Sequence, residues 1–262
     1  DRADGILTEA FGDIDEAEPP AAHAMARGIA TRAQILQQLD RLDEFRAAAA
    51  AAREAYRRIG PVERLVVANL IYAQSLDAPA DAVAVLDEAV RLSGARDIAL
   101  DARLGRARAL VAAGRNADAI DEYVEVIGMC AERGLEDGSA FVRFELAHAY
   151  FHAGRALEAA ETGEEALLRL IKLGDQAGAD HCRKLLAEIY ASLNEHESAL
   201  EMLDQLAANL DGPDNLCGRG AALERAGELL YRIDRDALAA ERFAAAAEAY
   251  RLAGAYLDDR TV

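Results

Sequence analysis

Apolar residues and alanines recur along most of the chain at spacings of three and four residues. Residues at these spacings share one face of a helix, so the pattern predicts amphipathic helices. The segment around Leu65 and Val67 could form a strand in isolation, but Val66, Leu70 and Ala73 keep the helical spacing. We therefore predict an all-helical chain, with twelve helices in its repetitive part and no β-sheet.

The helical pattern returns at a nearly constant interval. Segments 146–167 and 186–207 align with an offset of 40 residues, which places Tyr150 over Tyr190. Steps of 40 and then 37 residues extend the alignment to six units, each with a helix, a turn and a second helix. Small residues recur at one place in the first helix (Ala107, Ala147, Ala187, Gly227) and at one place in the second (Ala119, Ala159, Ala199, Ala239).

Residues that tolerate a left-handed backbone separate the helices. Gly114, Gly154 and Asn194 fall between the two helices of their units, where the chain must turn sharply. A Gly also follows the second helix of every unit, and we expect each of these to end its helix in the left-handed conformation. They are Gly60, Gly94, Gly134, Gly174, Gly212 and Gly254.

These signals predict the domain organisation. Residues 1–20 form an acidic N-terminal extension, residues 21–254 form the repeat domain, and residues 255–262 form a C-terminal tail or the start of a further helix. The six repeats lie near 26–60, 63–94, 100–134, 140–174, 180–212 and 220–254.

The spacing of small, aromatic and turn residues resembles the tetratricopeptide repeat over roughly residues 26–254. The units of 37 and 40 residues are longer than the usual 34 and lack the early Trp and the Pro after the second helix, as in long repeats from the C-terminal halves of bacterial regulators. HEAT-type units have a similar length but not this spacing. The matching residues are Ala147, Tyr150, Gly154, Ala159 and Ala166, followed by Ala187, Tyr190, Asn194 and Ala199.

The resemblance implies a fold and a class of function. The expected fold is all-α: a right-handed α-α superhelix, or solenoid, of about six helix–turn–helix repeats. No single helix pair can bury its own apolar face, so neighbouring pairs stack into one core and leave an extended concave surface. Such a surface is expected to bind a protein or a peptide segment.

Composition agrees with closely packed helices. Of 262 residues, 52% are hydrophobic, yet only 5% are aromatic and none is Trp. Much of the apolar content is Ala, the strongest helix former. A strand-rich fold would need more Val, Ile, Thr and aromatic residues than Ala.

Charge narrows the range of partners. The chain has 29 Lys and Arg against 47 Asp and Glu, a net charge of −18. This field repels phosphate, so we expect no direct binding to nucleic acid, and it favours basic partners. The alternative is that the acidic surface serves solubility only.

Cysteine spacing and hydropathy bear on the location of the protein. Cys130, Cys182 and Cys217 show no CxxC spacing and are expected to be free thiols in a reducing compartment. The sequence has neither an uncharged run of 18 apolar residues nor a leader pattern. We therefore expect a cytoplasmic protein that does not bind a membrane.

No sequence signature of catalysis is present. Walker A, GxGxxG, GxSxG, HExxH and CxxC patterns are all missing from the sequence. We therefore predict that the protein is not an enzyme, with no catalytic residue and no cofactor.

The first helix of the fourth unit differs from its counterparts. In the resembled family this helix lines the groove chiefly through its positions 2, 5, 9, 12 and 13, which here are Phe141, Phe144, His148, Phe151 and His152. The resemblance thus implies that these residues contact a ligand; the alternative is that some Phe belong to the core and the His are solvated. The family's carboxylate clamp of Lys and Asn is not reproduced. Neighbouring first helices would add Arg108, His181, Lys184 and Tyr231 to the groove.

Two of these residues could form a metal pair. His148 and His152 are four residues apart and share one helical face, as two ligands of one metal ion would. Glu145 or His181 would have to supply a third ligand, and the spacing identifies neither as one. We therefore predict no metal site.

Taken together, these features predict a bacterial scaffold or adaptor module without chemistry of its own. It would hold a protein or peptide segment in its groove. The alternative is the ligand- or peptide-sensing C-terminal half of a bacterial transcriptional or signalling regulator, in which the ligand alters the pitch of the superhelix.

Overall fold

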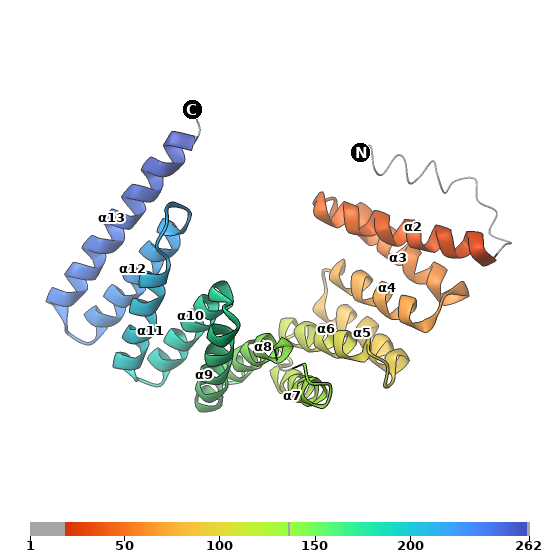
Figure 1. Ribbon diagram of the computed structural model, residues 1–262, viewed down its shortest axis with the longest axis horizontal. Coiled ribbons are helices and arrows are strands. Elements are labelled where there is room, and N and C mark those ends of the chain that lie inside the picture. The colour runs from red at the N-terminus through yellow and green to blue at the C-terminus, as the bar shows by residue number, and fades with distance from the viewer. Residues whose placement is uncertain (1–18, 136, 261–262) are drawn as a thin grey trace. The chain divides into compact units, whose positions relative to one another are not determined.

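The computed structural model describes residues 19–135 and 137–260. Our expectations for residues 1–18 and 261–262 lie outside these ranges. Within them the chain forms twelve α-helices and one short 3-10 helix and no strand, so the predicted all-α fold class is confirmed (Figure 1). In the same ranges no helix is both long and apolar enough to cross a membrane.

The first of two compact units extends to Met129, within the last of its helices. Between Pro19 and Ala112, each helix of this unit packs against the next helix along the chain. The helices are α2 (Pro19–Gln38), α3 (Leu42–Ile59), α4 (Val62–Gln74), α5 (Pro79–Ser93), α6 (Ala99–Ala112) and α7 (Asn116–Glu132).

The second unit begins at Cys130 and has the same organisation. Neighbouring helices again lie side by side, as Figure 1 shows for α12 and α13. The helices are α8 (Gly138–His152), α9 (Ala156–Leu173), α10 (Gln176–Ser192), α11 (His196–Asn209), the 3-10 helix η1 (Pro213–Asn215), α12 (Leu216–Arg232) and α13 (Asp236–Arg260).

The small residues of the repeat occupy the contacts between helices. Ala147 on α8 and Ala159 on α9 have no exposed surface, and Ala187 and Ala199 are also buried. At Gly163 on α9 an added Cβ would lie 2.8 Å from the side chain of Leu186 on α10, closer than side chains pack. The small side chains therefore let neighbouring helices approach, which is the physical basis predicted for the repeat.

The turns inside the units have the predicted left-handed backbone. Gly114 (φ 72°), Gly154 (φ 75°) and Asn194 (φ 61°) all have positive φ. After the second helices, Gly94, Gly134 and Gly174 also have positive φ.

Three of the predicted helix-ending glycines behave differently. Gly60 (φ −91°) and Gly212 (φ 169°) are extended. Each precedes a proline, Pro61 or Pro213, whose ring disfavours a helical backbone at the preceding residue, so the helix ends without a left-handed turn. Gly254 does not end a helix, because it lies inside α13.

Two boundaries also differ from the expected ones. Helix α2 begins at Pro19, which we had placed in the N-terminal extension, and proline is well suited to the first turn of a helix. Residues 255–260 continue α13 rather than forming a separate tail.

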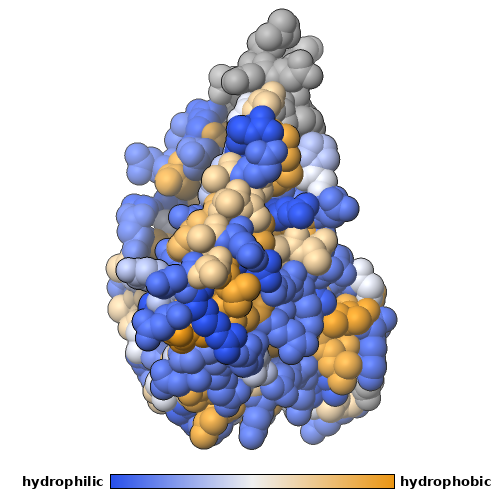
Figure 2. Space-filling model, turned by 90° about the vertical axis from the view of Figure 1, so that its left-hand side faces the viewer, coloured by the Kyte–Doolittle hydropathy of each residue, from blue (hydrophilic) through white to orange (hydrophobic). Residues whose placement is uncertain are grey.

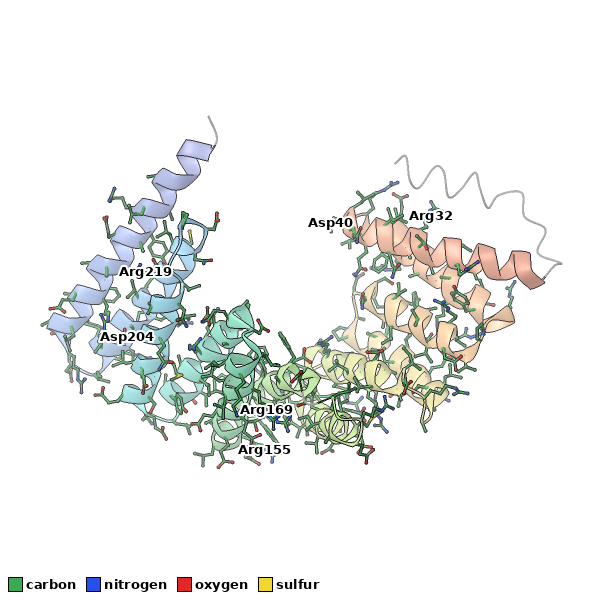
Figure 3. All side chains as sticks on the ribbon, in the orientation of Figure 1. Arg32, Asp40, Arg155, Arg169, Asp204 and Arg219 are labelled. Atoms are coloured by element: carbon green, nitrogen blue, oxygen red, sulfur yellow. The ribbon has the colours of Figure 1, made fainter. Side chains whose placement is uncertain are left out.

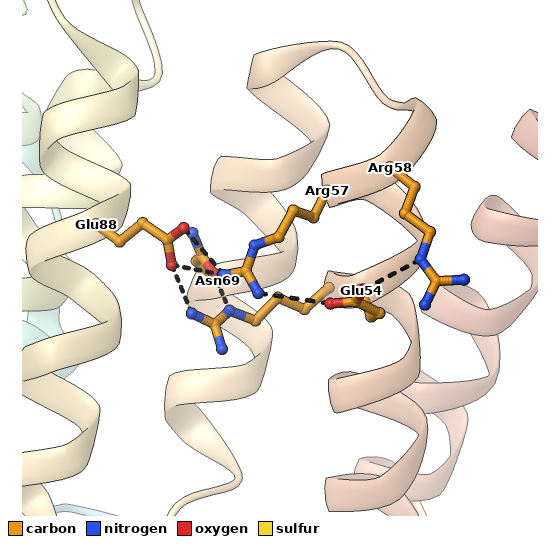
Figure 4. A network of polar contacts seen from close by, with 6 residues as sticks. Glu54, Arg57, Arg58, Asn69 and Glu88 are labelled. Atoms are coloured by element: carbon orange, nitrogen blue, oxygen red, sulfur yellow. Dashed lines mark hydrogen bonds and ion pairs between the residues drawn. The ribbon is translucent and has the colours of Figure 1, made fainter.

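A polar cluster ties three helices of the first unit together (Figure 4). The Arg53 guanidinium of α3 donates to the Asn69 side-chain oxygen on α4 (2.6 Å) and to the Glu88 carboxylate on α5 (2.5 Å). Arg57 donates to the same carboxylate. Burial by itself would raise the pKa of Glu88, but hydrogen bonds and charges from Arg53 and Arg57 lower it overall. The cluster fixes the contact between consecutive helix pairs.

Candidate binding groove

A groove of about 690 Å³ lies between α10 and α12, with α11 beneath it. All of its residues belong to the second unit. One wall is formed by Ala177, His181, Lys184, Glu188 and Ala191 of α10, and the other by Gly218, Ala221, Arg225, Glu228 and Arg232 of α12.

The periodicity of the two wall helices explains why these residues face the groove. On each helix they recur every three or four positions, so they form one stripe along the helix. Small residues at both walls, such as Ala177 and Ala221, leave room between the charged side chains.

The floor of the groove is apolar. Leu203 and Leu206 on α11 and Leu229 on α12 line it and are each less than a tenth exposed. Leu210, which follows α11, adds a partly buried side chain. A ligand that reaches the floor therefore meets a surface suited to an aliphatic side chain.

A polar cluster with satisfied hydrogen bonds also lines the groove. The Asp180 carboxylate accepts hydrogen bonds from Arg183 (2.8 Å), Gln176 (3.0 Å) and Asn209 (3.0 Å). The guanidinium of Arg183, only 8% exposed, also donates to Gln205. The negative charge of Asp180 is therefore compensated inside the protein.

The remaining carboxylates of the walls share one arginine. The guanidinium of Arg225 lies 3.9 Å from the Glu188 carboxylate on the opposite wall and 3.6 Å from that of Glu228 on its own helix. These pairs are exposed and long, so each contributes little to folding stability.

The aromatic residues of α8 lie in two environments. Phe144 and Phe151 are half-buried and pack against the apolar core that includes Ala147, Leu186 and Ile189. Phe141 is 49% exposed. Phe141 is therefore the most open of the three rings, whereas Phe144 and Phe151 keep only part of their surface exposed.

His148 and His152 meet on the exposed side of α8. Their Nε2 atoms are 3.3 Å apart and the rings are edge to face. Burial and the neighbouring His152 lower the pKa of His148, against the opposing effect of the Glu188 and Glu145 carboxylates. Over residues 19–135 and 137–260, no three His, Cys, Asp or Glu side chains are placed to hold one metal ion.

The structure brings only some of the predicted groove residues together. His181 and Lys184 line the α10 wall. Tyr231 is 66% exposed and lies with Phe243 in an adjoining hollow of about 380 Å³, which shares Arg225, Glu228 and Arg232 with the groove. Arg108 is exposed on α6, in the first unit.

Several groove residues were missed by the sequence analysis although a signal existed. One step of 40 residues from His148 leads to Glu188, and two steps from Phe141, His148 and His152 lead to Ala221, Glu228 and Arg232, all of which line the groove. The single step from His152 leads to Ser192, which does not line it. The floor residues of α11 and the amide of Asn209 had no such signal, because the expected groove positions were confined to first helices.

The thiols give the groove no nucleophile. Cys182, on the buried side of α10, donates to the carbonyl oxygen of Gly163 (3.1 Å), and burial raises its pKa to about 12. Cys130 is also buried and Cys217 is exposed, and all three cysteines are free thiols. At such a pKa the Cys182 thiolate is scarce at neutral pH.

In the view of Figure 2, apolar side chains in orange and tan lie among blue hydrophilic ones. Charged side chains project from both units, and the labelled Asp204 on α11 and Arg219 on α12 are examples in the second (Figure 3). Asp204 pairs with Arg242 on α13 (2.9 Å).

Comparison with known proteins identifies the fold. No family model matches the sequence, and no curated protein matches it. A kinesin light chain from Podospora anserina with nearly identical TPR-like repeats has a similar structure, with a TM-score of 0.63 and 20% identity over 74% of this chain and 96% of that one.

Two further structures are similar. A STAND signal-transduction ATPase from Pyrococcus horikoshii with a tetratricopeptide repeat sensor gives a TM-score of 0.74 at 14% identity, over 98% of this chain and 40% of that one. A Rap protein complexed with competence and sporulation factor gives a TM-score of 0.56 at 16% identity, over 88% of this chain and 65% of that one. The fold is therefore of the tetratricopeptide type, as the repeat pattern predicted.

Proposed function

We propose that this chain is a non-catalytic binding module that holds a protein or peptide segment in the groove between α10 and α12. The observation that carries the proposal is the combination of a groove of about 690 Å³ with an apolar floor and charged walls. Binding sites commonly combine an apolar surface with a few placed polar groups.

The geometry suits a chain segment with at least one aliphatic side chain. Such a side chain would reach Leu203, Leu206 and Leu229, while the segment itself would lie between the stripes of α10 and α12. In support, the Rap protein of similar fold was solved in complex with a factor.

A sensor role is the second candidate, favoured by the structural similarity to a STAND ATPase whose tetratricopeptide repeats form a sensor. A ligand that contacts both walls would change the separation of α10 and α12. Small-angle scattering distinguishes the two roles, because a sensor changes its compactness when its ligand is added and a passive scaffold does not.

The module is expected to work in the bacterial cytoplasm. Three free thiols, of which Cys217 is exposed, suit a reducing compartment. Alkylation of the protein inside its native cells, followed by mass measurement, should then show Cys217 modified and no disulfide.

A displayed library of random peptides tests the proposed groove. Peptides selected on the wild-type protein should fail to bind an Ala221→Arg variant, because the long side chain fills the groove from its α12 wall. The matched control is Ala244→Arg, which places the same side chain on an exposed position of α13. Equal binding to both variants, or no selected peptide at all, would refute the proposed function.

A further inference from the structure

The charge inside the groove differs from the charge of the chain. The protein as a whole has a net charge of −18, which favours basic partners. At physiological salt, however, exposed charges more than about 8 Å apart are largely screened. A bound segment therefore experiences mainly the side chains that line the groove.

Each acidic side chain of the groove already has an arginine partner, and Glu188 and Glu228 share one. Asp180 accepts three hydrogen bonds, one of them from the guanidinium of Arg183. Glu188 and Glu228 both lie near the guanidinium of Arg225. A basic ligand would have to compete with these arginines for its carboxylates.

Two cations of the groove have no such compensation. Lys184 lines the α10 wall and Arg232 the α12 wall, and both are exposed. Within the described part of the chain neither has a carboxylate at ion-pair distance. A ligand can therefore pair with these two charges without breaking an existing ion pair.

We propose that the groove binds an acidic peptide segment, in which an aliphatic side chain is flanked by carboxylates. This inference rests on the proposed function and specifies its partner. The aliphatic side chain contacts Leu203, Leu206 and Leu229 on the floor, and carboxylates on either side pair with Lys184 and Arg232. From the local charges we therefore expect an acidic partner, in place of the basic partner expected from composition.

Three synthetic peptides test this inference. They share a central leucine and a common length, and their flanking positions carry glutamate, serine or lysine. Measured by fluorescence anisotropy, the glutamate peptide should bind most tightly and the lysine peptide most weakly. The difference should shrink at high salt, because exposed ion pairs are screened.

Charge reversal at the two cations provides the second part of the test. Lys184→Glu and Arg232→Glu should each lower the affinity for the glutamate peptide by about two- to fivefold, the range expected for an exposed ion pair. Each should also raise the affinity for the lysine peptide. The chain offers a matched control, since its other lysine, Lys172, is exposed on α9 outside the groove. Lys172→Glu changes the net charge equally and should leave the order of the peptides unchanged.

The outcomes separate this inference from the proposed function. Tighter binding of the lysine peptide, or an order unaffected by Lys184→Glu and Arg232→Glu, overturns the acidic preference while groove binding stands. If none of the three peptides binds, and the displayed library yields no sequence either, both proposals fail.

Discussion

The guanidinium of Arg225 on α12 lies 3.9 Å from the carboxylate of Glu188 on α10, so an ion pair joins the two walls of the groove. The two side chains are 63% and 44% exposed. An exposed pair at this distance is worth at most about 1 kcal/mol of folding stability. Its main consequence is electrostatic, because it lowers the positive charge that a ligand meets.

Glu188→Gln should therefore change binding more than stability. We expect the free energy of unfolding in urea to change by less than about 0.5 kcal/mol, as for an exposed ion pair. The glutamate peptide should bind more tightly, because Arg225 then has one carboxylate fewer to pair with. A loss of stability above 1 kcal/mol, roughly the upper limit of an exposed pair, would show that the pair holds the walls together.

The double substitution of Phe144 and Phe151 by Ala should destabilise the protein. Both rings pack against the core of the second unit, so their loss removes buried apolar contacts. We expect a cost of about 2 kcal/mol for each, below the roughly 3–5 kcal/mol of a fully buried Phe. Thermal unfolding followed by circular dichroism measures it.

Phe141→Ala is the matched control for this pair. The ring of Phe141 is 49% exposed, and its loss should lower the melting temperature little. Unchanged stability in the double variant, with weaker peptide binding, would instead show that Phe144 and Phe151 contact the peptide, as the repeat resemblance implied.

Ala159→Leu tests the small-residue register. Ala159 has no exposed surface where α9 meets its neighbours, and a larger side chain would push the helices apart. Overpacking of this kind costs about 1–3 kcal/mol. Ala244→Leu, at an exposed position of α13, should cost far less in the same unfolding experiment. Equal costs would mean that the register does not control helix packing.

Glu88→Gln should lower stability at neutral pH and reduce its dependence on acid. Hydrogen bonds and charges from Arg53 and Arg57 outweigh burial and hold the pKa of Glu88 below its ordinary value. A carboxylate with a lowered pKa contributes stability above its unfolded pKa, and that stability is lost as pH falls through the folded pKa. We expect a cost of about 1–2 kcal/mol at neutral pH, since Arg53 loses a charged acceptor.

Melting temperatures of the wild type and the Glu88→Gln variant across the acid range measure this effect. The two curves should converge as Glu88 becomes protonated. The control Glu161→Gln removes an exposed carboxylate on α9 and should shift the curve little. Curves that stay parallel down to acid pH would exclude a lowered pKa at Glu88.

His148→Gln should make the protein more tolerant of mild acid. Burial and the neighbouring His152 lower the pKa of His148, so the unfolded chain takes up a proton there before the folded chain does. Stability therefore falls as pH drops through the unfolded histidine pKa, near 6.5. The drop in melting temperature from pH 8 to pH 5.5 should be smaller in the variant, because the variant lacks the proton uptake of His148 on unfolding. The same drop in both proteins would contradict the lowered pKa.

The sequence by itself determined the fold type and the packing register. A step of 40 residues connects Ala107, Ala147 and Ala187, and all three are buried where helices meet. This is a local property, since a helix buries whichever residues share one face. The turns at Gly114, Gly154 and Asn194 were equally predictable, because backbone conformation is set mainly by the residue itself and its neighbours.

Only the tertiary structure decided where the groove lies and how much of each aromatic ring on α8 is exposed. Phe141, Phe144 and Phe151 all fit the groove positions of a first helix, but Phe144 and Phe151 are partly buried against the core whereas Phe141 is 49% exposed. The groove itself needs α10 and α12 as walls and the leucines of α11 as a floor. Periodicity assigns a residue to a face of its own helix, whereas the distance between two helices, and so the space between them, depends on every side chain packed around both.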